Sequence, residues 1–168
     1  MSRPFAVLAI VAAAAGAVAA YGDSQRLASA STVVAGLLRP APPTRDAEIP
    51  RGNGGEFALS ARINGAHVPM VIDTGATSVV LTWETAKAVG LPLELLAYDV
   101  DVETAGGKTR AARLTLDRLA VGKLVERSVP ALVVPRGQMK TNLLGMSFLD
   151  RLESWEVRPE SLKLRGYP

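Results

Sequence analysis

From residue 56 onward, apolar and polar residues alternate with the two-residue period of strands that bury one face. The first such strand covers 57–63, and Asn64-Gly65 follows it. Both residue types tolerate the positive φ angles of a two-residue hairpin turn, so the next strand, 68–72, is expected to return beside the first. This second strand leads directly to Asp73.

Further along the chain, the same alternation predicts several short strands separated by turns. The predicted strands are 79–81, 98–104, 109–116, 119–121, 129–134, 155–157 and 162–164. Thr82 is suited to cap a single helix over 83–89, which Gly90 would end. A second short helix is predicted over 146–152. Short strands, frequent turns and one or two short helices indicate a mostly β, barrel-like domain.

The N-terminal part of the chain has a different composition. Arg3 precedes an uncharged apolar run over 5–21, which is typical of a secretory signal peptide or an N-terminal membrane anchor. The run is slightly shorter than the roughly 20 residues that span a bilayer, so both alternatives stay open for residues 1–22, beside a soluble helix. Residues 23–53 are rich in proline and glycine and are expected to form a linker. The folded domain is then expected over 54–168.

Composition narrows the possible chemistry. The chain contains no Cys and a single His, His67, so disulfide frameworks, thiolate metal sites and multi-His metal sites are excluded. A Ser-His-Asp triad is also disfavoured, because His67 directly follows a predicted hairpin turn. The net charge is +3, and the basic residues are scattered among acidic ones. Such a surface is typical of a solvated domain and does not indicate a nucleic-acid partner.

The segment 71–77 reads Val-Ile-Asp-Thr-Gly-Ala-Thr and is the strongest candidate for chemistry. It places one carboxylate, Asp73, after an apolar strand and on a turn that contains glycine. Two carboxylates that share a proton can activate water for attack on a peptide bond, whereas one alone does this poorly. The chain has a single copy, so a catalytic Asp73 predicts a symmetric dimer. The alternative is a tight turn that Asp73 merely caps.

Two further features accompany this segment: a hairpin with Gly106-Gly107 at its tip, and Asn142-Leu143-Leu144-Gly145 before a short helix. With these three features, the chain resembles the retropepsin-like aspartic proteases over roughly 55–165. It is most similar to their single-domain, membrane-associated bacterial members. The resemblance implies a closed β-barrel, working as a homodimer, that hydrolyses peptide bonds of extended peptide or protein substrates. It implies neither a metal nor an organic cofactor.

Both readings of the N-terminal segment, anchor and cleaved signal, export the rest of the chain. The protein is therefore expected in the cell envelope, either anchored in the inner membrane through this segment and facing the periplasm, or periplasmic or secreted after cleavage. The resemblance implies a role for each motif residue. Asp73 of each chain would supply one catalytic carboxylate, and Thr74 would hydrogen-bond across the two-fold axis. Gly75 and Ala76 would complete the active-site loop close to substrate.

The other two motifs would surround this loop. The hairpin would act as a flap that closes over bound peptide, and its residues are Thr104, Ala105, Gly106 and Gly107. Leu143, Leu144 and Gly145 would pack behind the loop as a hydrophobic-hydrophobic-glycine element.

The sequence departs from the retroviral members at two positions. Those proteins usually carry Asp where this chain has Thr77 and Arg where it has Met146, and the two residues form an ion pair near the dimer interface. Both members of this ion pair are absent here, so neither charge is left without its partner. Without the pair, the sequence does not define the contacts of the dimer. Two other readings therefore remain: a catalytically silent module that binds peptides or only dimerises, and a β-rich scaffold with a coincidental motif.

Overall fold

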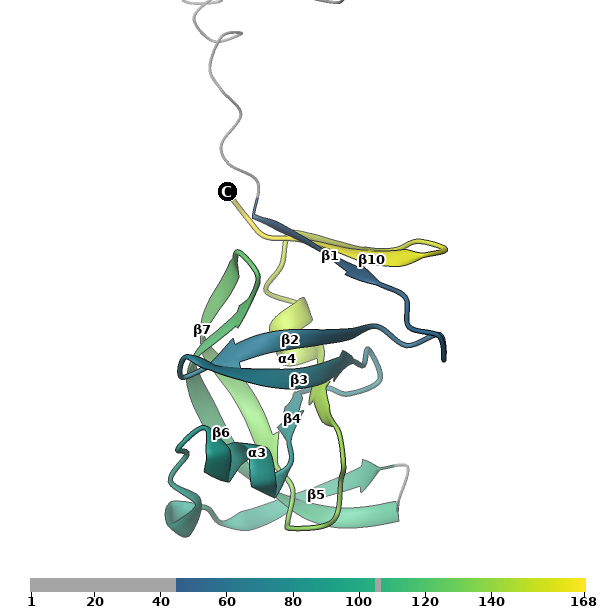
Figure 1. Ribbon diagram of the computed structural model, residues 1–168. Coiled ribbons are helices and arrows are strands. Elements are labelled where there is room, and N and C mark those ends of the chain that lie inside the picture. Colours follow the sequence, from purple (N-terminus) through teal and green to yellow (C-terminus); the bar gives the residue numbers. More distant parts are fainter. Residues whose placement is uncertain (1–44, 105–106) are drawn as a thin grey trace, which may run out of the picture. The chain divides into compact units, whose positions relative to one another are not determined.

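The computed structural model describes residues 45–104 and 107–168 (Figure 1). The predicted signal peptide or anchor, 1–22, and most of the predicted linker lie outside these residues. Among the residues that are described, no helix combines the length and the apolar composition that crossing a membrane requires.

The described residues form ten strands, two short α-helices and one 3-10 helix. The strands are β1 (Asp46–Pro50), β2 (Ala58–Ile63), β3 (Ala66–Ile72), β4 (Val79–Leu81), β5 (Tyr98–Thr104), β6 (Gly107–Val121), β7 (Leu124–Val133), β8 (Asn142–Leu144), β9 (Ser154–Val157) and β10 (Ser161–Arg165). The helices are α3 (Trp83–Ala88), α4 (Met146–Leu149) and the 3-10 helix η1 (Leu93–Leu95).

Six strands close into a barrel in the order β2-β3-β8-β4-β7-β6, because β2 also pairs with β6. Strand β5 extends the sheet beyond β6 and forms its edge. The predicted mostly β closed barrel with short helices is thereby confirmed. Two pairings are parallel, β3 with β8 and β4 with β7. Parallel strands end at the same edge of a sheet, so the residues that follow β3 and β8 come together.

Local sequence signals predict the turns and the first helix correctly. Asn64 and Gly65 both have positive φ, as a two-residue hairpin turn between β2 and β3 requires. The Thr82 hydroxyl accepts a hydrogen bond from the backbone N–H of Thr85 and so caps α3. Gly90 has a φ of 75°. Glycine adopts this left-handed conformation without a side-chain clash, and the helix ends there.

The extents of other elements differ from the prediction. Strand β6 is one continuous strand of 15 residues, so the predicted separate strands 109–116 and 119–121 are wrong. Between them, Asp117 and Arg118 are exposed on β6 and interrupt the alternation, and β6 keeps the same register with β7 on both sides of Asp117. The second helix, α4, ends at Leu149 and not at residue 152.

A second sheet, in the order β1-β10-β9, is built from both ends of the described chain. Residues 46–50, which the sequence predicts to belong to the linker, instead pair as β1 with the C-terminal strand β10 from Asp46↔Arg165 to Pro50↔Ser161. Ile49 is buried there and packs into the core. The folded unit therefore begins before residue 54, because a strand partner more than a hundred residues away stabilises a segment with little local signal.

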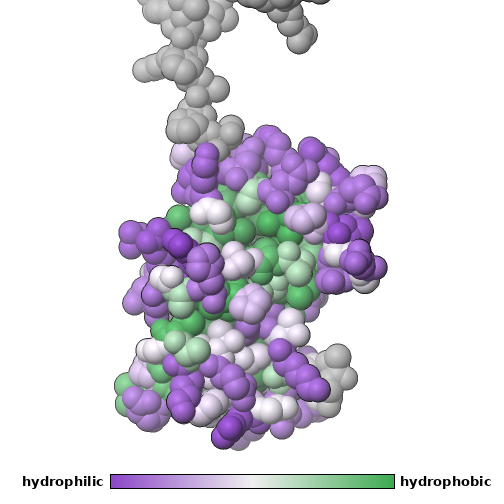
Figure 2. All heavy atoms as spheres, viewed as in Figure 1, coloured by the Kyte–Doolittle hydropathy of each residue, from purple (hydrophilic) through white to green (hydrophobic). Residues whose placement is uncertain are grey.

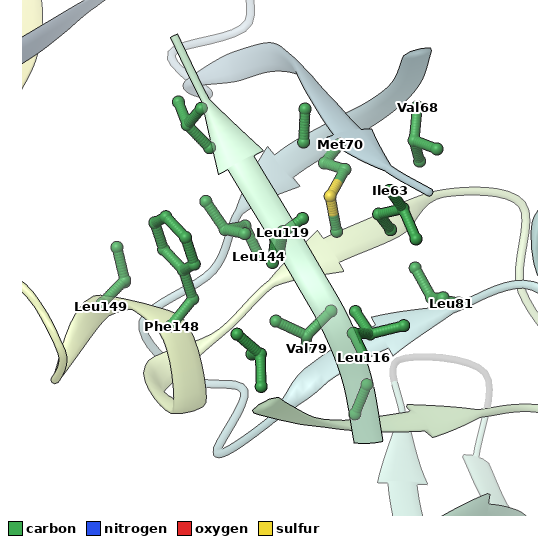
Figure 3. Packing of buried hydrophobic residues seen from close by; sticks show 14 of the residues in the cluster. Ile63, Val68, Met70, Val79, Leu81, Leu116, Leu119, Leu144, Phe148 and Leu149 are labelled. Carbon is green, nitrogen blue, oxygen red and sulfur yellow. The ribbon is translucent and has the colours of Figure 1, made fainter. Parts of the chain in front are cut away.

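Side chains from several strands pack together in the barrel interior (Figure 3). Buried residues from several strands and from α4 meet there, and the largest include Ile63, Met70, Leu116, Leu144 and Phe148. Burial of each large apolar side chain stabilises the fold by about 1.5–3 kcal/mol. This packed core leaves the loops at the strand ends as the places where a ligand can bind.

Candidate active site

Asp73 lies at the C-terminal end of β3, on the loop that leads to β4. Its backbone N–H donates to the carbonyl of Leu144 on the parallel strand β8, at 3.1 Å. Its carboxylate oxygen Oδ1 accepts a hydrogen bond from the Gly75 N–H at 2.9 Å, and its carbonyl accepts one from the Ala76 N–H at 3.2 Å. The loop thus fixes the orientation of the half-buried carboxylate through its own backbone.

The residues after Asp73 differ in exposure and in whether they line the neighbouring cleft. A side chain at Gly75 would place its Cβ 3.2 Å from Asp73 Oδ1, tighter than ordinary contact, so glycine leaves the carboxylate room. Thr74 is exposed at the loop, whereas Ala76 is half-buried and lines the neighbouring cleft. The structure therefore brings Asp73, Gly75 and Ala76 together at one wall of the cleft.

Gly145 makes the closest approach to this loop. The Met146 N–H donates to the Ala76 carbonyl at 2.8 Å, and the Ser147 N–H donates to the Thr77 carbonyl at 3.1 Å. A Cβ on Gly145 would lie 2.6 Å from the Ala76 carbonyl oxygen and would overlap the Ser78 carbonyl. Glycine is needed here because backbone packs directly on backbone. Leu143, on the cleft side, and buried Leu144 precede it on β8.

Ser147 also holds the loop, although the sequence alone did not single it out. Its hydroxyl accepts from the Val79 N–H at 2.9 Å and donates to the Pro130 carbonyl at 2.7 Å. It thereby joins the start of β4 to β7. The segments of Thr77 and Met146, which lack the ion pair of the retroviral members, are joined here by Ser147 and by backbone hydrogen bonds. The sequence signal for this role is a small hydroxyl residue, Ser147, two positions after Gly145.

Asn142 stabilises the same region from the other side. Its side chain is only 5% exposed. Its Oδ1 accepts from the Thr82 N–H and its Nδ2 donates to the Pro69 carbonyl, both at 2.9 Å. One amide side chain thus links β3, which carries Asp73, to the start of α3. The sequence identified Asn142 as part of a motif but did not predict these partners.

A cleft of about 670 Å³ opens in front of the Asp73 loop. The loop 73–78, strand β5 and the segment 138–141 form its walls, and its apolar lining includes Val80, Leu132, Val134 and Leu143. Figure 2 shows the molecule narrowing above its lower end, which carries the β5–β6 hairpin in Figure 1. Because β5 is an edge strand, its unpaired backbone groups are available for an extended segment entering this cleft.

The predicted hairpin is present as β5 and β6. Thr104 faces Gly107 across the hairpin, and the Thr104 hydroxyl donates to the Gly107 carbonyl at 2.9 Å. Thr104 lines the cleft together with Val102. Ala105 and Gly106, the expected flap tip, lie outside the described residues.

Two further carboxylates line the cleft, on β5. Asp101 lies 3.6 Å from the guanidinium of Arg110, and its side chain is 93% exposed. Glu103 is exposed and faces Lys108 across the hairpin. Both acids are therefore compensated by cations on β6 and solvated. Among the residues that the structure describes, no group of three or more His, Asp or Glu side chains comes together to hold a metal ion.

His67 sits apart from the cleft, on the exposed face of the β2–β3 hairpin. Its Nε2 lies 3.2 Å from the Arg62 Nε–H, which donates to it, and its Nδ1 lies 3.1 Å from the Ser60 hydroxyl. Since Nε2 accepts, Nδ1 carries the proton in the neutral ring and cannot take one from Ser60. The arrangement is consistent with the surface position expected for His67.

Residues 59–148 match the aspartyl protease family. The chain belongs to this family. A retropepsin-like aspartic protease from Rickettsia conorii has a similar structure, with a TM-score of 0.66 and 30% sequence identity over 73% of this chain and 92% of that one. The EIAV protease, solved with an inhibitor, shares the fold with a TM-score of 0.51 at 17% identity, covering 61% and 93% of the two chains.

Two curated proteins have similar sequences. An uncharacterized protein encoded in the cobV 5′ region of a Sinorhizobium species is 38% identical over 111 residues, covering 66% of this chain and 48% of the relative. An uncharacterized protein of Rickettsia prowazekii is 31% identical over 116 residues, covering 69% and 49%. This chain thus spans about half the length of the curated relatives it matches.

The role of Asn142 predicts a large loss of stability in Asn142→Leu. The substitution leaves the buried Thr82 N–H and the partly buried Pro69 carbonyl without hydrogen-bond partners. Each unsatisfied group lowers the stability by about 1–3 kcal/mol. Asn142→Asp still accepts from Thr82 but sets an oxygen of a buried carboxylate against the Pro69 carbonyl, so it should also be destabilised. Urea unfolding measures these differences, with Asn53→Leu at an exposed position as the control. Equal stability of Asn142→Leu and the control would contradict the cross-link.

Gly145→Ala tests the close approach behind the Asp73 loop. The added methyl group meets two backbone carbonyls that cannot rotate away, so we expect a loss of about 1–3 kcal/mol of stability. Gly54→Ala is the matched control, because a Cβ there meets only the flexible side chain of Glu56. Thermal unfolding of both variants gives the comparison. If the two variants have the same unfolding temperature, the packing of the Asp73 loop does not require glycine at position 145.

Proposed function

We propose that this protein is an aspartic endopeptidase whose active site is completed by Asp73 of a partner subunit. The main support is the position of Asp73: its carboxylate is held by a rigid loop at the wall of an apolar cleft that adjoins an edge strand. Family membership and the retropepsin-like fold support peptide hydrolysis as the chemistry.

The proposal needs a second carboxylate, and the described part of one chain offers no good candidate. Asp101 and Glu103 lie on the opposite wall of the cleft, solvated and facing Arg110 and Lys108. A two-fold axis beside the loop would instead bring two identical Asp73 side chains together. Close carboxylates cannot both ionise, so one pKa rises and the other falls, as in aspartic proteases generally.

In this mechanism, the ionised Asp73 accepts a proton from a water molecule held between the two carboxylates. The water oxygen attacks the scissile carbonyl carbon, while the protonated Asp73 donates a hydrogen bond, and then its proton, to the carbonyl oxygen. A tetrahedral diol results. Proton transfer to the amide nitrogen then allows the C–N bond to break, which releases a carboxylic acid and an amine. The reaction needs no metal ion and no organic cofactor.

The cleft favours extended peptide or protein segments as substrates. An extended chain can pair its backbone with the free edge of β5 while alternate side chains enter the apolar region around Val80, Leu132 and Leu143. Folded proteins do not offer such segments except in loops and termini. We therefore propose partly unfolded or extended segments of proteins as the substrate class.

Asp73→Asn tests the chemistry. The amide oxygen can still accept the Gly75 hydrogen bond, so the fold should persist, but the amide cannot act as a base. We expect kcat to fall by about 10²–10⁴-fold. Cleavage of a peptide library by the full chain is measured by mass spectrometry. Asp99→Asn, on β5 outside the cleft lining, is the control. Peptide binding without cleavage by the wild type would instead favour the catalytically silent module.

A mixing experiment tests the need for two chains. Wild-type and Asp73→Asn subunits are combined in equal amounts and allowed to exchange. If every site needs Asp73 from both partners, random pairing leaves about one quarter of the wild-type activity at equal total protein, by counting on a two-fold dimer. Independent sites would leave about one half. A linear response to the wild-type fraction would mean that Asp73 has its partner within its own chain.

A further inference from the structure

A second cleft, of about 460 Å³, adjoins the cleft in front of the Asp73 loop. The two clefts share part of their lining, which consists of Thr77, Ser78, Asp101, Val102 and Leu132. Beyond these shared residues the second cleft reaches strands β6 and β7, where Arg113 and Pro130 line it. A segment bound in front of Asp73 can therefore place one of its side chains in the second cleft.

The register of the barrel sheet sets Arg113 in one row with apolar residues near Asp73. The paired residues, in order across β3, β8, β4, β7 and β6, are Val71, Leu143, Val80, Leu132 and Arg113. Directly paired residues project from the same face of a sheet. The four apolar members are half-buried, whereas Arg113 at the end of the row is exposed. The row thus leads from the strand that carries Asp73 to a cation in the second cleft.

The spacing of this row suits an extended substrate. Neighbouring strands lie about 4.8 Å apart, so the Cα of Arg113 is about 14 Å from that of Leu143 along the row. On one face of an extended peptide, side chains recur about every 6.7 Å. The guanidinium at the end of the long Arg113 side chain is therefore within reach of a substrate side chain about two to four residues from the bond held at Asp73.

The charge of Arg113 is available to a ligand. Of the described residues that line the second cleft, Arg113 is the only cation. Within 45–104 and 107–168 its side chain has no ion pair and no hydrogen bond. The one acid of this lining, Asp101, lies 3.6 Å from Arg110, so these two charges compensate each other. Thr77, where the retroviral members usually carry Asp, is neutral. The second cleft therefore has a net positive charge.

We infer that the second cleft binds an acidic side chain of the substrate through Arg113, and that peptides with Asp or Glu about two to four residues from the scissile bond are preferred. This inference rests on the proposed function, because it names a substrate feature for the Asp73 site. The planar guanidinium presents two parallel N–H donors that match a carboxylate, and it stays protonated. Each subunit of the dimer would supply one Arg113, so the preference is expected on both sides of the scissile bond.

Matched peptide pools test this preference with the full-length protein. Each pool holds short random peptides with Glu, Gln or Lys fixed at one position, and cleavage is measured by mass spectrometry. The wild type should cleave Glu pools with about five- to tenfold higher kcat/KM than Gln pools when the fixed position lies within reach of Arg113. Arg113→Met keeps the apolar stem and removes the charge, so the ratio should fall to about one. Arg113→Glu should favour Lys pools over Glu pools.

A control and a binding measurement separate the possible outcomes. Arg118→Met removes an exposed cation from the same strand but from neither cleft, so the Glu preference should persist. Binding of the same pools, labelled with a fluorophore, to Asp73→Asn protein is followed by anisotropy. Equal cleavage and equal binding of Glu and Gln pools would overturn the role of Arg113 even if Asp73-dependent hydrolysis is found. Tighter binding of Glu pools that Arg113→Met abolishes, without hydrolysis by the wild type, would support the acidic-side-chain site and overturn the proposed peptidase.

Discussion

The parallel pairing of β3 with β8 is the constraint on which the rest of the site depends. It sets Ile72 beside Leu144, so the chain leaves both strands at the same point. From there, backbone hydrogen bonds join Asp73 to Leu144, Ala76 to Met146, and Thr77 to Ser147. Each such bond contributes only about 0.5–1.5 kcal/mol, but together they leave the loop one arrangement. The carboxylate is positioned by backbone and not by flexible side chains.

This arrangement explains the composition of the two motifs together. Glycine at 145 is required because the carbonyls of Ala76 and Ser78 occupy the space of a side chain. Ser147 and Asn142 then satisfy backbone groups that the crossing leaves without partners. Asp-Thr-Gly and Leu-Leu-Gly are thus two halves of one contact, although some seventy residues separate them. A change in either half alters the position of Asp73.

Much of this structure could be predicted from local sequence signals, and the remainder could not for a physical reason. Asn64-Gly65 and Thr82 act within a few residues, so their turn and cap are visible in the sequence. The motif resemblance located Asp73 and Gly145 on facing segments. Strand β1 was not predicted because its stability comes from pairing with β10, at the other end of the domain. Arg51, which donates to the carbonyls of Pro159 and Arg158, was not predicted for the same reason, since these partners are more than a hundred residues away.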